Sequence, residues 1–296
     1  MQRLRPYVLP VAIVLGLLLH RWCAMFSFLV PYIIFTILLL TFSAVDLRRL
    51  KFSPLDIWLM LFQIVVSIGS YLLIKLLGGN NTIAEGVLIG VLCPVASSVA
   101  VISCLLGANR ATVTTYTIVG NLMVALVAPV VFTLIGHHPE MSLWQSFLLM
   151  FTKIGSTLAL PFLIALALQL WLPKVNAVVR QLNIMGFYLW ACALLFTLGQ
   201  TIDFIFLHGR GNWNNIAWLA GLSLLFCVVQ FSTGRLIGRR YGNRIGGGQL
   251  LGQKNTAFGI WMANTFLNPL AAVFLAFYSV YQNIFNAWQM AHIKKK

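Results

Sequence analysis

The chain has 296 residues, of which 60% are hydrophobic and only 8% are charged. Soluble domains carry roughly a quarter of their residues as charged side chains, so this composition excludes a soluble globular protein. It predicts an all-α polytopic membrane protein, whose net charge of +15 reflects basic loops beside anionic lipid rather than contact with nucleic acid.

Ten segments are apolar and long enough to cross a bilayer, since about 20 apolar residues span the hydrocarbon core as a helix. The first follows Arg3 and Arg5 but ends in HRWC without a small-residue cleavage site, so we expect a retained helix rather than a signal peptide. The expected spans are residues 5–20, 25–45, 54–77, 83–107, 112–136, 143–172, 182–205, 213–236, 246–267 and 269–290.

The basic residues test this count independently. With ten helices, 15 of the 20 Lys and Arg residues fall on the side that holds both termini, three fall on the other side, and two lie within spans. Cytoplasmic loops carry the excess of Lys and Arg. We therefore expect a multi-pass protein of the plasma membrane, in a bacterium the inner membrane, with both termini cytoplasmic and residues 291–296 as a basic cytoplasmic tail.

Two of the spans are interrupted near their midpoints. In span four, Pro94 removes a backbone donor and precedes a run of small and hydroxylated residues. In span nine, Gly252 precedes the polar sequence QKNT. Spans four and nine correspond if residues 1–136 and 143–290 are two five-helix halves, and an odd number of helices per half makes the second an inverted repeat of the first.

Interrupted helices at corresponding places in two halves indicate the binding site of a secondary transporter. Unwound backbone is tolerated at membrane depth only where protein or water satisfies it. Two helix N-termini, near Ser97 and near Thr256, would point into the bilayer centre, each with unpaired amide donors and roughly half a positive charge, which favours an anion. The alternative is that Pro94 and Gly252 only kink their helices, as Pro and Gly do in many membrane helices.

Four short stretches carry a family resemblance: CPVASSVAV in span four, the Ala108–Asn109 turn before span five, GQKNTAFG in span nine and YSVYQNIFNAW in span ten. With these the chain resembles the bile acid:sodium symporter family over most of its length. The resemblance implies discontinuous helices four and nine that cross in a core domain of helices 3–5 and 8–10, against a panel domain of helices 1, 2, 6 and 7. It also implies import of bile acids or smaller organic anions with sodium.

The chain departs from that family at the sodium ligands. A ligating Thr is retained as Thr117, and Gln63 corresponds to a family Gln. The positions that the resemblance assigns to the other ligands hold Val99, Ala100, Val113, Leu250 and Lys254. Sodium is a hard cation that favours several oxygens, ideally including a carboxylate. All five acidic residues lie in loops or near span ends: Asp46, Asp56, Glu85, Glu140 and Asp203. We therefore expect sodium coupling to be altered or absent, with no other cofactor or metal.

Lys254 places a charged side chain near the middle of span nine. A charge at the bilayer centre costs about 2.5–3.5 kcal/mol on insertion scales, so its ammonium needs a compensating role. We expect it to replace a bound sodium ion, held by carbonyls freed in the two breaks, with Thr117 and Gln63 as candidate partners. It would favour an anionic substrate beside four residues: Ser97, Ser98, Asn255 and Thr256. Transport would then be uniport, exchange or proton-coupled through Lys254. The alternative is that Lys254 extends along its helix to the cytoplasmic surface.

Other function classes remain open. A cation/proton antiporter needs paired midplane carboxylates, and a membrane hydrolase or acyltransferase needs a base beside its nucleophile; neither arrangement is evident, so we expect no enzyme. An ordinary sodium-coupled bile acid symporter is the second alternative. The remaining polar side chains within spans are expected to bind neighbouring helices rather than substrate: Asn121, Gln200, Gln230, Asn264, Gln282, Asn283 and Asn286.

Overall fold

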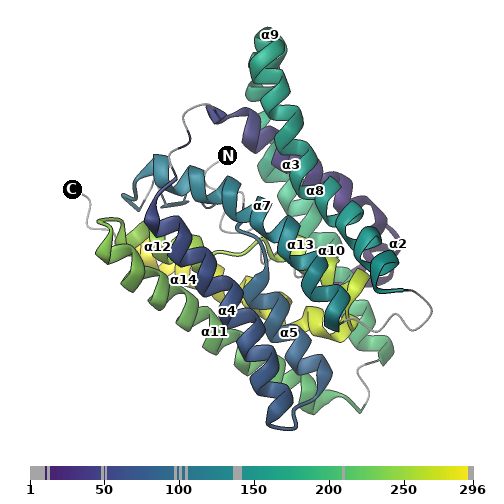
Figure 1. The fold of residues 1–296 in the computed structure, drawn as a ribbon. Coiled ribbons are helices and arrows are strands. Elements are labelled where there is room, and N and C mark those ends of the chain that lie inside the picture. The colour runs from purple at the N-terminus through teal and green to yellow at the C-terminus, as the bar shows by residue number, and fades with distance from the viewer. Residues whose placement is uncertain are drawn as a thin grey trace.

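The computed structural model describes residues 11, 14–47, 50, 52–96, 99, 102–103, 106–135, 142–208 and 211–292. Every regular element in these ranges is a helix, apart from one isolated backbone bridge (Figure 1). Six helical stretches have the length and hydropathy of membrane spans: Pro54–Leu76, Thr112–Ile135, Leu143–Trp171, Tyr188–Leu207, Trp213–Arg240 and Pro269–Met290. Together with the composition, they identify a helical membrane protein.

Among the described residues up to 135 there are five helices. They are α2 (His20–Met25), α3 (Val30–Ser43), α4 (Pro54–Leu76), α5 (Asn81–Leu92) and α7 (Arg110–Ile135).

Among the described residues from 142 onward there are seven helices, two of which have nine residues each. They are α8 (Leu143–Trp171), α9 (Pro173–Gln181), α10 (Gly186–His208), α11 (Trp213–Arg240), α12 (Arg244–Gly252), α13 (Thr256–Phe266) and α14 (Ala272–Ala291). Short 3₁₀ turns precede three of the helices: η2 (Ser27–Leu29), η4 (Leu182–Met185) and η5 (Pro269–Ala271).

Side-chain caps explain where several helices begin. At α4, the Ser53 side chain and the Asp56 carboxylate bond to each other's backbone amides, and Pro54 occupies the first helical position, where a proline costs no hydrogen bond. Ser142 and Gln145 form the same reciprocal cap at α8. Asp56 is fully buried, so one of the five acidic residues is used at a helix start.

The spans predicted by hydropathy agree closely with α4, α7, α8, α11 and α14. The end of span one requires a correction. It was expected at residue 20, but helix α2 reaches Met25. A Cβ added to Gly199 of α10 would lie 2.3 Å from Cys23 Cβ, and His20 Nδ1 lies 2.6 Å from an Asp203 carboxylate oxygen. These contacts with α10 keep the sequence HRWCAM helical.

Helix α9 lies where a loop was expected between spans six and seven. It has a polar face and an apolar face, as surface helices do, and it projects beyond the end of α8 (Figure 1). A nine-residue amphipathic helix is too short to cross a bilayer, so hydropathy does not detect it.

The helices form two packed sets. In one set, α4 packs on α5, and α11 packs on α5, α12 and α14; in the other, α3 and α10 pack on each other, with α8 against α3 and α2 against α10 (Figure 1). Helix α7 lies along α8 and also contacts α12 and α4, while α13 contacts α14 and α10. The ends of α5 and α12 therefore lie inside the structure, where other helices surround them.

Candidate functional site

Two helices stop inside the protein, and the segments that follow them cross. Helix α5 ends at Leu92, and α12 ends at Gly252, four residues before α13 begins. Val95 and Lys254 form an antiparallel backbone bridge. On one side of it the Ala96 amide donates to the Gln253 carbonyl at 3.2 Å, and on the other the Asn255 amide donates to the Pro94 carbonyl at 2.8 Å.

The bridge explains how the chain tolerates unwound backbone away from water. A buried amide or carbonyl must find a partner, and each unwound segment supplies donors and acceptors for the other. Pro94 has no amide hydrogen to satisfy, and its carbonyl is used as an acceptor. In the described residues, both interruptions are therefore places where a helix ends and extended backbone follows, rather than kinks within continuous helices.

Side chains from neighbouring helices form hydrogen bonds with the backbone groups that the bridge leaves unpaired. Gln282 of α14 accepts from the Lys254 amide at 2.8 Å and donates to the Lys254 carbonyl at 3.1 Å. Asn121 of α7 accepts from the Val95 amide at 3.1 Å. Gln282 therefore bonds to both backbone groups of one residue, as a neighbouring strand would, whereas Asn121 supplies a single acceptor.

The carbonyls at the ends of α5 and α12 are held in a similar way. Gln63 of α4 donates to the carbonyls of Leu92 and Cys93 at 2.8 and 3.0 Å, and the Tyr116 hydroxyl donates to the Gln63 side-chain oxygen at 3.1 Å. At the end of α12, the Tyr278 hydroxyl donates to the Gly252 carbonyl at 2.8 Å.

Lys254 lies at the centre of this crossing with 1% of its surface exposed. Its ammonium donates to the Val91 carbonyl in the last turn of α5 at 2.8 Å. Within the described part of the chain, no carboxylate forms an ion pair with it. The side chain therefore reaches across to α5 and does not extend along α12 to the surface.

The expected carbonyl partner of Lys254 is present as that of Val91, but the two side chains expected with it require a correction. Thr117 donates its hydroxyl to the Val113 carbonyl one turn earlier in α7 at 2.8 Å, and Gln63 bonds to the carbonyls that follow Val91. Neither side chain bonds to the ammonium. A backbone carbonyl takes this place because the last carbonyls of a helix have no intrahelical donor.

Of the four residues expected beside the substrate, the structure describes two. Ser97 and Ser98 lie outside the described residues. The Asn255 side-chain oxygen caps α13 by accepting from the Phe258 amide at 3.3 Å, and Asn255 is only partly buried. Thr256 begins α13 and is 3% exposed. The Asn255 amide group is therefore the more accessible of the two at the start of α13.

Three of the positions compared with sodium ligands lie together in an apolar cluster. Val99, Val113 and Leu250 are each fully buried, and they pack with Val95 and Tyr116. Ala100 lies outside the described residues. A sodium ion needs oxygen ligands, and these aliphatic side chains offer none. Aliphatic side chains therefore occupy the positions that the resemblance assigns to sodium ligands, and they pack against Val95 at the crossing.

The polar residues assigned to helix binding mostly do so. Asn121 and Gln282 bind the crossing, Gln230 donates to Tyr278 at 3.0 Å, and Gln249 donates to Asn286 at 3.0 Å. The sequence does not point to Tyr116 and Tyr278, because a buried tyrosine that donates a hydrogen bond has the same pattern as one that only packs. Asn264 of α13 differs, because both polar atoms of its side chain are buried without a hydrogen-bond partner in the described structure.

The arrangement is a crossing of two interrupted segments beside the buried ammonium of Lys254, a positive charge that can attract an anion. No cluster of three or more His, Cys, Asp or Glu side chains suited to a metal is present among the residues described. No family model matches the chain, and comparison with curated proteins gives no match.

Proposed function

We propose that this protein is a secondary transporter that carries an organic anion, a bile acid or a smaller carboxylate, by alternating access. The proposal includes ten membrane helices in two inverted five-helix repeats, with a core of helices 3–5 and 8–10 moving against a panel of helices 1, 2, 6 and 7. The single observation that carries it is the fully buried ammonium of Lys254, bound to the Val91 carbonyl where two interrupted helices cross.

The matching interruptions support the repeat architecture. Helix α5 and the α12–α13 pair are the elements expected as helices four and nine, and their unwound segments run antiparallel at the bridge between Val95 and Lys254. Opposed directions at the crossing are what an inverted repeat produces. The two packed sets of helices, α4–α5–α11–α12–α14 and α2–α3–α8–α10, are also divided as a core and a panel would be.

The charge of Lys254 supports an anionic substrate without sodium. Burial costs an ammonium several kcal/mol unless it is compensated, and within the described residues its hydrogen-bond partner is one neutral carbonyl. An anion beside the crossing would supply the missing counter-charge. Meanwhile, Val99, Val113 and Leu250 leave no side-chain oxygens for a mobile cation. We therefore propose that the fixed ammonium stands in for sodium and that transport is uniport, exchange or proton-coupled.

The N-terminus of α13 supports the position of the substrate. It lies directly after Lys254, and a helix N-terminus carries roughly half a positive charge. Its capping residue Asn255 is only partly buried. A carboxylate placed there would meet the helix dipole and the ammonium together, which is the arrangement that would favour anions over neutral or cationic solutes.

The decisive experiment is counterflow in proteoliposomes with a panel of radiolabelled organic anions, in sodium and in choline buffers. We expect substrate exchange that persists when choline replaces sodium. Lys254→Met should abolish it, because the site loses its positive charge. Lys75→Met, which removes an ammonium at the end of α4, is the matched control and should transport normally.

The opposite results would overturn the proposal. Flux that disappears in choline would indicate an ordinary sodium symporter, and full anion flux in Lys254→Met would remove the role of the ammonium. A Lys254→Gln variant that gains sodium dependence would support the replacement of sodium directly. If an anion raises the melting temperature of the protein and is recovered chemically unchanged, the carrier is favoured over an enzyme.

A further inference from the structure

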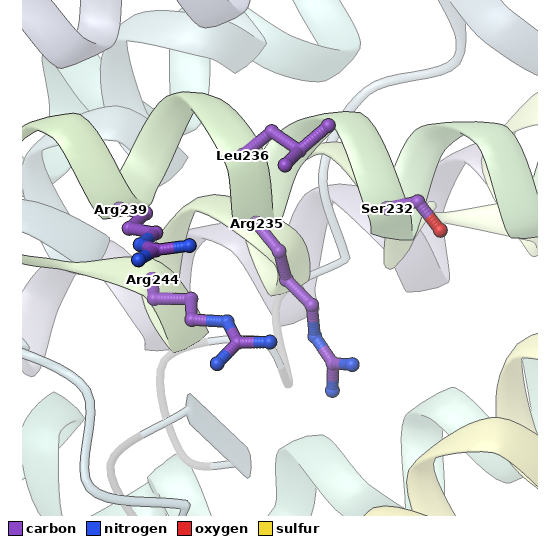
Figure 2. A pocket seen from close by; sticks show the side chains of 5 residues that line it. All are labelled: Ser232, Arg235, Leu236, Arg239 and Arg244. Atoms are coloured by element: carbon purple, nitrogen blue, oxygen red, sulfur yellow. The ribbon is translucent and has the colours of Figure 1, made fainter.

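Three arginines gather where α11 ends and α12 begins, away from the crossing. Arg235 and Arg239 lie one turn apart on α11, and Arg244 is the first residue of α12. With Ser232 and Leu236 they line a cavity of about 250 Å³. Figure 2 shows the side chains of Arg235 and Arg244 extending into the same space, with the guanidinium of Arg239 beside Arg244.

The close contact between α11 and α12 places these side chains. A Cβ added to Gly247 would lie 2.3 Å from the Gly234 carbonyl oxygen, so only glycine allows the two backbones to approach so closely. A three-residue turn with Gly242 at φ +68° reverses the chain, and Asn243 caps α12 by accepting from the Gly246 amide. Arg244 is thereby returned alongside the last turns of α11.

Arg235 is held more firmly than an ordinary surface arginine. A Cβ on Gly248 would lie 2.5 Å from Arg235 Cγ, so its stem rests on the bare backbone of α12. Its guanidinium carbon lies 5.2 Å from the centre of the Phe285 ring in a cation–π contact. A guanidinium fixed on an aromatic face keeps its N–H groups available for a ligand.

The cluster has positive charge without a counter-charge. Among the residues described, none of the three guanidiniums forms an ion pair or a hydrogen bond with an acidic side chain, and Arg235 and Arg244 are close enough to repel each other. Like charges held together by the fold are unfavourable unless an anion joins them. Arginine matches phosphate oxygens with pairs of parallel N–H donors, so phosphate is the anion that this geometry fits.

The surroundings of the cavity indicate an amphiphile. Leu225, Val228 and Leu236 recur at helical spacing on α11 and are 54%, 55% and 69% exposed. They form an apolar face that leads away from the arginines toward the middle of the helix. The distribution of basic residues predicts that this end of α11 lies at the cytoplasmic surface, where basic pockets between membrane helices bind lipid headgroups.

We propose that Arg235, Arg239 and Arg244 form a binding site for the phosphate of an anionic phospholipid, with the acyl chains along the Leu225–Val228–Leu236 face of α11. A cavity of about 250 Å³ equals roughly eight water volumes at about 30 Å³ each, which suits a headgroup phosphate with its glycerol. The site is separate from Lys254 and does not depend on what the protein transports.

The test is native mass spectrometry of the full chain released from nanodiscs of phosphatidylcholine with a minority of phosphatidylglycerol. Wild type should retain phosphatidylglycerol in excess of its share of the bilayer. The double variant Arg239→Gln/Arg244→Gln should bind it about 25-fold more weakly, since each arginine near the membrane contributes about fivefold. Arg240→Gln/Lys174→Gln removes two exposed charges outside the cavity and should retain the lipid as wild type does.

A second arm separates a lipid from a soluble phosphate. Glycerol phosphate is titrated against wild type in pure phosphatidylcholine nanodiscs, and binding is read from the shift in melting temperature. No shift, with phosphatidylglycerol retained, supports the lipid; a shift that the double variant lacks supports the same phosphate site with a soluble ester as its occupant. No lipid enrichment in wild type, or equal loss in the control variant, overturns the proposal.

Discussion

The unwound backbone around Lys254 depends on one side chain more than on any other. Gln282 satisfies both the amide and the carbonyl of Lys254. The carbonyl has a second donor, because the Thr256 amide also bonds to it at 3.0 Å. For the amide, Gln282 is the partner, and Lys254 is only 1% exposed.

Replacing Gln282 with leucine should therefore destabilise the protein. The variant keeps a similar volume but leaves the Lys254 amide buried without an acceptor, at a cost of about 1–3 kcal/mol. We expect a lower melting temperature in detergent, measured by the exposure of buried cysteines to a thiol-reactive dye. Anion counterflow should fall as well, because the ammonium is no longer held at the crossing.

Asn283→Leu is the matched control. Asn283 is the next residue on α14, but its amide group donates to the Ser279 carbonyl of its own helix at 2.6 Å. Its loss leaves the crossing intact, and the melting temperature should stay close to that of wild type. An equal drop in both variants would mean that α14 tolerates no leucine here, and the specific role of Gln282 would be lost.

At this scale the sequence identifies groups but not their partners. Lys254 can be picked out because a charge within an apolar span needs an explanation. Its partner Val91 cannot, because a backbone carbonyl has no signature and the contact joins residues 163 positions apart. Gln63 was expected as a partner of Lys254, and the structure instead shows it bonded to the two carbonyls that follow Val91. The carbonyls of Val91, Leu92 and Cys93 lie within one helical turn, so a prediction that is wrong by one turn assigns the wrong acceptor to Lys254.

Of the helix pairs described, α11 and α12 form the closest contact in which each helix needs a glycine. A Cβ on Gly234 would lie 2.3 Å from the Gly247 carbonyl oxygen, and the reverse distance is the same. Helices in a membrane associate through such packing, since lipid is as apolar as the side chains. This contact fixes the direction of α12 and hence where it ends, at Gly252.

Gly247→Ala should separate these two helices. Overpacking against rigid backbone costs about 1–3 kcal/mol, so we expect a lower melting temperature and weaker retention of phosphatidylglycerol, since Arg244 moves with α12. Thermal unfolding in detergent and the nanodisc assay measure the two effects.

Gly221→Ala is the control for the same pair of helices. A Cβ at Gly221 in α11 meets no atom within 4 Å, and alanine is a better helix former than glycine by about 0.5–1 kcal/mol. This variant should be as stable as wild type or slightly more so. A destabilised Gly221→Ala beside an unaffected Gly247→Ala would contradict the packing described for α11 and α12.

The elements also mark where hydropathy succeeds and fails. The long spans are predictable because about 20 apolar residues in succession leave few alternatives in a membrane, and Pro94 and the polar QKNT stretch locate the breaks. Helix α9 is missed because its signal is amphipathic rather than apolar. The extension of α2 to Met25 depends on Cys23 against Gly199 and on His20 beside Asp203, which are contacts between segments that sequence order does not connect.

For the whole molecule, the direction of insertion rests on charge. Fifteen basic residues fall on one side of the expected spans and three on the other, which predicts the orientation but leaves the transport direction open. The ten expected spans also predict which turns share a side of the membrane. The turn between α4 and α5 follows the third expected span, and the start of α9 follows the sixth. If each expected span crosses the membrane once, these two places lie on opposite sides of it.

Single cysteines at these two places should report opposite sides of the membrane. Leu77, just after α4, is 76% exposed, and Lys174 lies in the first turn of α9 and is exposed. In intact cells an impermeant maleimide should label Leu77→Cys and leave Lys174→Cys unmodified until the cells are permeabilised. Native Cys192 is exposed on α10, so both variants are compared with the parent chain and with Cys192→Ser. Labelling of both cysteines from outside would break the ten-span count, and the reverse pattern would invert the orientation and place the arginine cavity on the outer surface.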